Sequence, residues 1–338
     1  MTIIQNLGEY KDNCLWIKRE DFIPFSFGGN KARKAILFFE EIDKGDYDCV
    51  VTYGSGSSNH CRIIANQCCR RGMECHIISP EEASEPTFNS RMMELFGAQI
   101  TVVPVTQVHD TIEAKLASLK SEGKKPYFIE GGGHGNIGTE AFVQCYNEIR
   151  EQETELGTHF DYIFFASGTG TTHAGLVCGQ LLAGDCIGDE TGPDFRAGAG
   201  TDTGAERRTI VGISIARKNP RGRNVVLDSV RAYLGERASI GAEASAADNA
   251  SISEEAIQKA TIFVDDFTSG YGKDDQRVID TIEMVLKTYG IPLDSTYTGK
   301  AFMGMSEYLA GHRITGKNIL FIHTGGTPLF FDTLNKNL

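Results

Sequence analysis

Several features that would point to particular partners are missing from this chain of 338 residues. It has no long basic run and carries a net charge of −12, so nucleic acid and anionic membranes are poor expectations as partners. No apolar run approaches the roughly 18 residues that a membrane span needs. The first residues, MTIIQNLGEYKDN, lack the basic and apolar segments of a signal peptide. We therefore expect a cytoplasmic protein without a membrane partner.

Disulfide and metal frameworks are also missing. The nine cysteines have no framework spacing, and no CxxC pair occurs. An odd number of scattered cysteines in a long chain suits a reducing compartment and mostly buried thiols. His60, His134, His173 and His323 form no recognisable metal motif, and a buried or capping role is the better expectation for each. We expect no metal.

What the chain does contain is a repeated alternation of apolar runs, Gly-rich loops and amphipathic segments. A strand, a Gly/Ser loop, a helix and a second strand in succession imply a parallel crossover. The strands are apolar on both faces, as in a sheet covered by helices on two sides. The sequence predicts strands at 14–19, 48–53, 74–79, 99–104, 126–130, 162–166, 209–215, 261–264 and 318–322. It predicts helices at 31–45, 60–71, 86–96, 108–122, 137–156, 173–183, 223–235, 253–260, 274–289 and 299–311.

Two segments interrupt this rhythm. Residues 185–208 are rich in Gly, Asp and Thr, and residues 239–253 are rich in Ala and Ser. We expect residues 185–208 to be an exposed loop or disordered, and residues 239–253 to be a loop before the next helix. The length of the chain suits two domains. Glycine clusters fall just after several strands, and ligands of doubly wound α/β folds bind at the carboxyl ends of strands.

Residues 26–34, SFGGNKARK, place a lysine at the start of a predicted helix. We expect Asn30 to be the N-cap and Lys31 to lie in the first turn. The positive end of the helix dipole disfavours a cation there, and the cation of Lys34 acts in the same direction. A neutral lysine amine is a nucleophile that condenses with carbonyl groups. The alternative is a solvated basic helix start without a ligand.

Residues 167–172, SGTGTT, form the best candidate for a phosphate site. They lie between a buried strand and a helix and offer consecutive backbone N–H groups, two glycines and several hydroxyls. An ordinary tight turn is the alternative. The segment is not a Walker A loop, because no GK[ST] follows, and it lacks the GxGxxG spacing of a dinucleotide site. A nucleotide-binding oxidoreductase is therefore disfavoured.

Other polar residues follow strands or lie between glycines. Ser57, Ser58, Asn59 and His60 either cap the next helix or contact a carboxylate or phenolate oxygen of a ligand. Tyr271 and Tyr297 are each more typical of a packed loop aromatic than of a proton donor. A phosphate site combined with a lysine at a helix start indicates pyridoxal phosphate, which has a phosphate and an aldehyde and requires a lysine.

Six motifs occur in an order that resembles a known family. They are GGNKARK, SSNH, SGTGTTHAG, GYG, YTGKAFMGM and FIHTGG. From about Ile17 to Phe330 the chain resembles the D-cysteine desulfhydrase and 1-aminocyclopropane-1-carboxylate deaminase family, which has the tryptophan-synthase β-subunit fold. The resemblance implies an α/β protein with two open, twisted, mostly parallel sheets flanked by helices. It implies a cofactor cleft between a large domain (1–46 and 158–338) and a small domain (47–157).

The resemblance also implies roles for individual residues. Lys31 would hold pyridoxal phosphate as a Schiff base, and Asn59 would bond its phenolate oxygen. Lys34 would contact the phosphate together with the loop residues Ser167, Gly168, Thr169, Gly170, Thr171 and Thr172. Substrate contacts would come from Ser57, Ser58, Asn59, His60, Tyr271 and Tyr297, of which Ser58, Tyr271 and Tyr297 would take part in catalysis.

Two positions favour the desulfhydrase within this family. Thr298 and Thr324 stand where the deaminase carries a glutamate and a leucine. A hydroxyl that faces the pyridine nitrogen leaves it unprotonated, whereas a carboxylate would favour protonation. Elimination of a good leaving group needs a weaker electron sink than the opening of a cyclopropane. His60 departs from the glutamine that is usual in the family, so it could contact a different substrate side chain or act as a second base.

We therefore expect a lyase that deprotonates Cα of a small amino acid and eliminates its β-substituent, giving sulfide, pyruvate and ammonia from D-cysteine. The alternatives are a β-replacement synthase, a cyclopropane-amino-acid deaminase, and a non-catalytic protein that binds pyridoxal phosphate or another phosphate ligand. The family resemblance also implies a homodimer.

Overall fold

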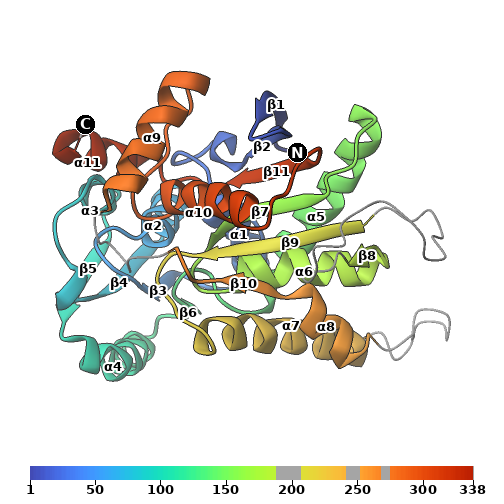
Figure 1. The fold of residues 1–338 in the computed structure, drawn as a ribbon. Helices are drawn as coiled ribbons and strands as arrows, with labels where there is room; N and C mark the ends of the chain where they lie inside the picture. The colour runs from blue at the N-terminus through green and yellow to red at the C-terminus, as the bar shows by residue number, and fades with distance from the viewer. Residues whose placement is uncertain (188–206, 241–251, 268–274, 338) are drawn as a thin grey trace. The chain divides into compact units, whose positions relative to one another are not determined.

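The computed structural model describes residues 1–187, 207–240, 252–267 and 275–337, which form two compact units (Figure 1). Unit 1 contains Met1–Arg19, Phe142–Lys273 and Lys300–His323, and unit 2 contains Glu20–Ala141, Asp274–Gly299 and Thr324–Leu338. These compact units are not the same ranges as the two domains expected from the sequence, which stay a prediction.

Unit 1 is built on a seven-stranded sheet with the order β1-β2-β11-β7-β9-β10, in which β8 also pairs with β9. Among the strand pairs of unit 1 that the structure describes, β1–β2 is antiparallel and the others are parallel. The strands are β1 (Ile4–Tyr10), β2 (Asn13–Arg19), β7 (Tyr162–Ser167), β8 (Cys186–Ile187), β9 (Arg207–Ser214), β10 (Ile262–Val264) and β11 (Asn318–His323).

The helices of unit 1 connect these parallel strands. They are most of α5 (Asn136–Leu156), α6 (Thr171–Ala183), α7 (Arg221–Ile240), α8 (Glu254–Ala260) and α10 (Thr298–Gly311), apart from its first two residues. Helix α6 packs on α7 and α8. Every residue of β7 is buried, which is the pattern expected of a central parallel strand.

Unit 2 has a four-stranded, fully parallel sheet with the order β5-β4-β3-β6. Its strands are β3 (Cys49–Tyr53), β4 (Glu74–Pro80), β5 (Gln99–Val103) and β6 (Pro126–Ile129). Its helices are α1 (Asn30–Lys44), α2 (Asn59–Arg71), α3 (Phe88–Leu95), α4 (Val108–Ser121), α9 (Gln276–Tyr289) and α11 (Thr327–Asn337).

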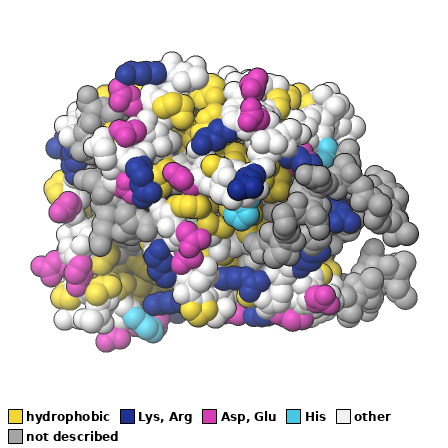
Figure 2. All heavy atoms as spheres, viewed as in Figure 1, with side chains coloured by type: hydrophobic (Ala, Val, Ile, Leu, Met, Phe, Trp, Pro, Cys, Tyr) yellow, Lys and Arg dark blue, Asp and Glu magenta, His cyan; other side chains and the backbone are white. Residues whose placement is uncertain are grey.

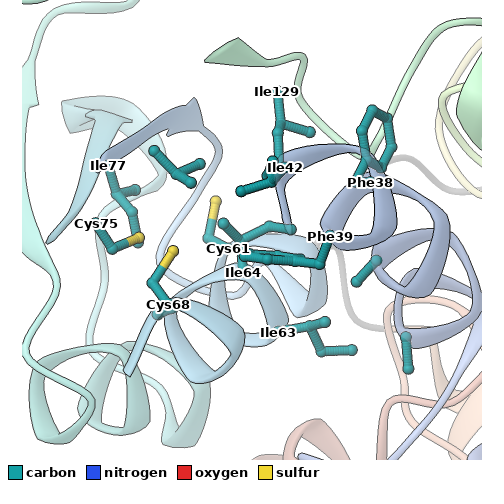
Figure 3. Close-up of a cluster of buried hydrophobic side chains, with 14 of the residues drawn as sticks. Phe38, Phe39, Ile42, Cys61, Ile63, Ile64, Cys68, Cys75, Ile77 and Ile129 are labelled. Atoms are coloured by element: carbon teal, nitrogen blue, oxygen red, sulfur yellow. The ribbon is translucent and has the colours of Figure 1, made fainter. Parts of the chain in front are cut away.

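Side chains of β3 contribute to hydrophobic clusters on both faces of the sheet of unit 2. Val50 packs into a cluster formed with α1 and α2, which includes Phe39 and Ile64 (Figure 3). Its neighbours Cys49 and Val51 point into a second cluster with α4. Alternate residues of a strand face opposite sides, so helices on both faces require an uninterrupted apolar run. This packing holds the carboxyl end of β3 and the start of α2 in place.

The expected alternation of strands and helices is confirmed, with four differences. Helix α7 ends at Ile240, so the first two residues of the expected loop 239–253 are helical. Strand β1 was not predicted, because its sequence, IQNLGEY, is mostly exposed and polar at an antiparallel edge. Helix α11 was missed as well. Residues 185–208 are not entirely a loop, since β8 and the start of β9 lie within this range. Residues 188–206 of that range lie outside the described residues.

On the face shown in Figure 2, basic and acidic side chains are interspersed. Within the part of the chain that the structure describes, no helix is long and apolar enough to cross a membrane. The same residues contain no group of three or more His, Cys, Asp or Glu side chains that could hold a metal ion.

Candidate functional site

Helices α1 and α6 both begin at a glycine in an unusual conformation. Their N-caps, Gly29 and Gly170, each have φ near 97°, and no side chain caps either helix. The expectation that Asn30 caps α1 is wrong, because Asn30 is the first helical residue and its N–H donates to the carbonyl oxygen of Thr324 at 3.0 Å. Glycine is required because a Cβ at Gly29 would lie 2.6 Å from that same oxygen.

Lys31 lies in the first turn of α1, as predicted, and its amine is inside the protein. Its Nζ donates to the carbonyl oxygen of Gly132 at 3.0 Å. Burial lowers its pKa to about 8, although the thiol of Cys61 acts slightly in the other direction. Within the described ranges no carboxylate pairs with Lys31, whereas Arg33 two residues on forms two hydrogen bonds to buried Glu20. The structure therefore keeps the Lys31 amine partly neutral near pH 7.

Lys34 lies one turn further along α1 and points to the same carbonyl group. Its side chain is buried, and its Nζ lies 3.4 Å from the oxygen of Gly132. Burial lowers its pKa well below the usual value, and the nearby Lys31 lowers it further. Sequence reasoning anticipated the two lysines but not their shared acceptor.

That acceptor belongs to the glycine-rich turn between β6 and α5. Gly133, Gly135 and Gly138 have the GxGxxG spacing, a signal that was overlooked in the sequence. The turn is closely packed, because a Cβ at Gly138 would lie 2.0 Å from the carbonyl oxygen of Gly133 and 3.4 Å from the Lys34 side chain. Gly133 and Gly138 allow the close contact between the turn and Lys34 of α1, whereas a Cβ at Gly135 would meet nothing within 4 Å.

The start of α2 carries Ser58, Asn59 and His60. Ser58 caps the helix, with its Oγ accepting from the N–H of Cys61 at 3.2 Å, which was one of the two alternatives left open for this motif. Helices α1 and α2 pack against each other, and the charges of Lys31 and Lys34 are close enough to lower the pKa of His60. The side chains expected near a cofactor on these two helices are therefore neighbours.

His60 is buried in a defined tautomer. Its Nε2 lies 2.9 Å from Oγ1 of Thr52, and that hydroxyl donates its single hydrogen to the carbonyl oxygen of Ile129 at 2.7 Å. The hydroxyl must therefore accept from the imidazole, so Nε2 carries the hydrogen and Nδ1 is an acceptor. Burial, followed by the two lysine charges, lowers the pKa of His60 well below 6.5. His60 is a neutral hydrogen-bond acceptor in this structure.

Tyr297 and Thr298 are held by a buried carboxylate that sequence reasoning missed. Oδ1 of Asp294 accepts from the N–H groups of Thr296 and Tyr297, and Oδ2 accepts from the N–H and hydroxyl of Thr298. A Cβ at Gly326 would lie 2.3 Å from the same Oδ2. Asp294 therefore links the Tyr297 loop to the turn that begins at Thr324 and packs on the start of α1.

The predicted phosphate loop lies in unit 1, between β7 and α6. Ser167, at the end of β7, has its Oγ 3.4 Å from Nδ1 of His173. Gly212 makes room for this buried imidazole, since a Cβ there would lie 2.4 Å from Nδ1. Gly170 needs its positive φ, and the uncapped first turn of α6 follows it. Such a turn suits an anion.

All of the predicted site residues except Tyr271 can now be placed. Unit 2 contains Lys31, Lys34, Ser57, Ser58, Asn59, His60, Tyr297, Thr298 and Thr324, and unit 1 contains Ser167, Gly168, Thr169, Gly170, Thr171 and Thr172. Contacts within unit 2 join the starts of α1 and α2 and, through Asp294, the Tyr297 loop. Tyr271 lies outside the described residues. A common site of the two sets is a proposal taken up below.

A large cavity in unit 1 is separate from the loop 167–172. It has a volume of about 880 Å³ and is lined mainly by charged side chains before β7 and at the start of β9. Arg208 in its wall is paired with Glu153, and Arg150 with Asp185. The cavity lies at the amino ends of these strands, whereas Ser167 ends β7 at the carboxyl edge. Four of the charged side chains in its wall are paired with one another, and it contains none of the predicted site residues, so it is not the candidate site.

An α/β protein with a partly neutral, half-buried lysine on one helix and a glycine N-cap on another has the donor set of a pyridoxal-phosphate enzyme. The comparison with known proteins agrees. The chain belongs to the family described as "Pyridoxal-phosphate dependent enzyme", whose profile matches residues 3–325.

The chain is also similar to individual enzymes. A D-cysteine desulfhydrase of Serratia proteamaculans (strain 568) is 30% identical over 340 residues, covering 97% of this chain and 91% of the relative. A solved structure described as an ACC deaminase homologue is 27% identical, with a TM-score of 0.77, and covers 99% of this chain and 92% of its own. A hydrogen sulfide-producing enzyme from Fusobacterium nucleatum is 16% identical, with a TM-score of 0.57 and coverages of 97% and 96%, and shows the fold alone.

These similarities confirm the family resemblance, the fold class, the cofactor and the expectation of an enzyme. The chain is a pyridoxal-phosphate-dependent enzyme of the lyase and deaminase kind. The residues present fit the cofactor, since they include an amine for its aldehyde and an uncapped helix start for its phosphate.

Proposed function

We propose that this enzyme eliminates the β-substituent of a small amino acid and that D-cysteine is its first candidate substrate, giving sulfide, pyruvate and ammonia. The single observation that carries the proposal is the buried amine of Lys31, whose pKa is about 8. The D-cysteine desulfhydrase relatives and Thr324 support elimination over ring opening, whereas the hydroxyl of Thr298 donates its single hydrogen to Asp294.

Pyridoxal phosphate supplies an aldehyde for the amines and a ring that withdraws electrons from the substrate carbon. Lys31 would hold the aldehyde and, once released by the substrate, remove the proton from Cα with its neutral Nζ. Lys34 and the loop 167–172 would hold the phosphate, and Asn59 would donate to the phenolate oxygen. The positive end of the dipole of α6, which begins after Gly170, would favour a doubly charged anion.

The substrate contacts would come from the start of α2 and from the Tyr297 loop. Ser58 would bind the substrate carboxylate, while its oxygen also caps α2. The acceptor Nδ1 of His60 would receive a hydrogen bond from the substrate rather than donate one, as its fixed tautomer requires. Tyr297 would flank the substrate, held by Asp294. Thr324 would face the pyridine nitrogen.

The first experiment tests Lys31. Protein purified with the cofactor should absorb at about 410–420 nm, as lysine-bound pyridoxal phosphate does. Lys31→Ala should lose this absorbance and all turnover. Lys44→Ala is the matched control, because Lys44 is exposed in the last turn of the same helix. A Lys31→Ala protein that keeps both absorbance and turnover would contradict the proposal.

The second experiment tests the substrate. D- and L-amino acids with β-leaving groups, and the cyclopropane amino acid, should be incubated with the holoenzyme and the products identified by mass. Pyruvate and sulfide from D-cysteine are expected. Their absence, with a new amino acid formed when a second nucleophile is present, would indicate β-replacement, and ammonia from the cyclopropane would indicate the deaminase. A colourless protein that takes up no cofactor would indicate a non-catalytic binder.

Two properties of the whole protein belong to the same proposal. We place the enzyme in the cytoplasm, because the scattered cysteines suit a reducing compartment. We also propose a homodimer, as the family resemblance implies. Sedimentation of the purified holoenzyme should give twice the chain mass of 36.9 kDa, and a monomer would reject the dimer.

A further inference from the structure

Arg62 in unit 2 is a buried cation without an acidic partner among the residues that the structure describes. Its side chain lies on the second turn of α2 and is fully buried. Nη1 donates to Oγ of Ser26 at 2.9 Å, and Nη2 donates to Oδ1 of Asn59 at 3.3 Å. Burial lowers its pKa to about 9, so the guanidinium is still charged at neutral pH. A buried charge is costly unless it is compensated, so its position calls for an explanation.

Asn89, near the start of α3, is a second donor to the same oxygen. It is fully buried, and its Nδ2 donates at 2.9 Å both to Oδ1 of Asn59 and to the backbone oxygen of Ser57. Thr87 and Ser90 form a capping box that fixes the start of this helix. Asn89 therefore holds the SSNH motif at two points from a rigid helix end.

The two donors determine which way the Asn59 amide faces. An amide nitrogen in place of Oδ1 would put N–H groups against the N–H groups of Arg62 and Asn89, so the flipped orientation is excluded by the hydrogen-bond pattern. The oxygen of Asn59 is turned toward Arg62 and Asn89. Its Nδ2 hydrogens are therefore directed away from this cluster and can be donated to a ligand.

We propose that Arg62 and Asn89 are positioning residues that make Asn59 a donor toward an anionic oxygen of the bound ligand, the phenolate oxygen of pyridoxal phosphate. The inference deepens the proposed function and rests on it. Hydrogen bonds received by an amide oxygen polarise the amide and strengthen its N–H as a donor. The charge of Arg62 thus stabilises the phenolate through Asn59, without touching the cofactor. A carboxylate beside Arg62 would cancel this effect.

A purely structural role makes a different prediction. Arg62 also ties α2 to Ser26 in the loop that leads to Lys31, and its guanidinium lies 5.9 Å from the ring centre of Phe27. If Arg62 only fastens this loop, its loss lowers stability but leaves the ionisation of the bound cofactor unchanged. The two roles are therefore separated by the spectrum and affinity of the cofactor, and not by activity alone.

The experiment compares Asn59→Ala, Arg62→Met, Asn89→Ala and the double variants Asn59→Ala/Arg62→Met and Asn59→Ala/Asn89→Ala. The affinity for pyridoxal phosphate and the pH dependence of the absorbance at about 415 nm are measured for each. The single variants should each weaken the affinity by about tenfold, equivalent to about 1.4 kcal/mol, and shift absorbance from this band to shorter wavelength. Each double variant should match Asn59→Ala, because both residues act through Asn59.

Two further variants complete the test. Arg70→Met removes an exposed arginine from the same helix and should change neither readout. Arg62→Lys keeps a charge and should restore part of the absorbance, which also covers the case in which Arg62→Met does not fold. Normal absorbance and affinity in Arg62→Met would overturn the inference, as would additive losses in the double variants. If Arg62→Met does not fold, normal absorbance and affinity in Asn89→Ala would overturn it. Wild-type protein that takes up no cofactor would instead overturn the proposed function, and the inference with it.

Discussion

The pKa of the Lys31 amine is determined by burial rather than by a neighbouring acid. Its pKa of about 8 lies below the usual 10.5, because the charged form loses water inside the protein. The protonated amine cannot attack an aldehyde. The rate at which the cofactor-free protein takes up pyridoxal phosphate should therefore rise with pH and level off above about 8, with a slope of about tenfold per pH unit well below this value. Stopped-flow absorbance would measure it.

The control for this pH profile is Lys44→Ala, which should keep the same midpoint. An uptake rate that does not change between about pH 6 and 9 would show that the Lys31 amine is not the titrating group. A midpoint near 10.5 would show that burial does not lower its pKa in the cofactor-free protein.

His60 should stay neutral over the whole physiological range. Its pKa is lowered first by burial and then by the charges of Lys31 and Lys34, so protonation requires a pH well below 6.5. Nitrogen-15 NMR of the imidazole should show the Nε2–H tautomer with shifts that are constant from about pH 6 to 8. Thr52→Val removes the acceptor of Nε2 and should allow the other tautomer. Exposed His109 supplies a reference signal in the same spectra.

A His60 signal that titrates near 6.5 would mean that the imidazole is accessible to water and to protons. It would then be free to donate to a substrate as well as to accept. Constant shifts with the Nδ1–H tautomer would contradict the hydrogen-bond chain through Thr52 and Ile129.

At the scale of elements, the start of α1 depends on two backbones that touch. Gly29 has φ 97°, and Gly325 approaches it so closely that a Cβ on Gly325 would lie 2.7 Å from the Cα of Gly29. Gly29→Ala adds both backbone strain and a clash with the Thr324 oxygen. It should destabilise the protein by about 1–3 kcal/mol and lower its urea midpoint.

Gly72→Ala separates the strain from the clash. Gly72 ends α2 with φ 64°, but a Cβ there would meet nothing within 4 Å. Gly72→Ala should lower the free energy of unfolding by about 1 kcal/mol, because of the left-handed conformation alone. Equal urea midpoints for the two variants would mean that the contact between Gly29 and the Thr324 turn does not contribute to the stability of α1.

At the scale of the whole molecule, the proposed site requires one ligand to use both units. Lys31 belongs to unit 2, and the loop 167–172 belongs to unit 1. Gly170→Ala places a Cβ at φ 97° and 3.2 Å from Cγ1 of Val225, which should distort the phosphate loop. Uptake of pyridoxal phosphate should weaken by about tenfold or more, whereas uptake of pyridoxal, which has no phosphate, should not change.

Gly184→Ala at the other end of α6 is the matched control, because Gly184 is also left-handed but has open space around it. Equal losses for pyridoxal and its phosphate in Gly170→Ala would show that the loop does not bind phosphate. The same result would mean that Lys31 and the loop 167–172 do not bind the same ligand. The phosphate would then have to be bound by other residues.

The sequence by itself determined the class of this protein. Apolar runs and glycine punctuation are local signals, so they were enough to predict the alternating α/β order, the placement of Lys31 in a first turn and the glycine-rich loop after β7. The ordered motifs were enough for the family. Strand β1 has no apolar run, so these local signals did not predict it. Its structure depends on pairing with β2.

Only the tertiary structure decided how the side chains are prepared for chemistry. The acceptor of Lys31 lies 101 residues away at Gly132, the tautomer of His60 depends on the carbonyl of Ile129, and the orientation of Asn59 depends on Asn89. Each of these is set by which atoms meet after β3, β6, α1, α2 and α3 pack together. A sequence pattern predicts which residues lie on a helix face, but the partner of a hydrogen bond and the loss of water around an amine are properties of the packed fold.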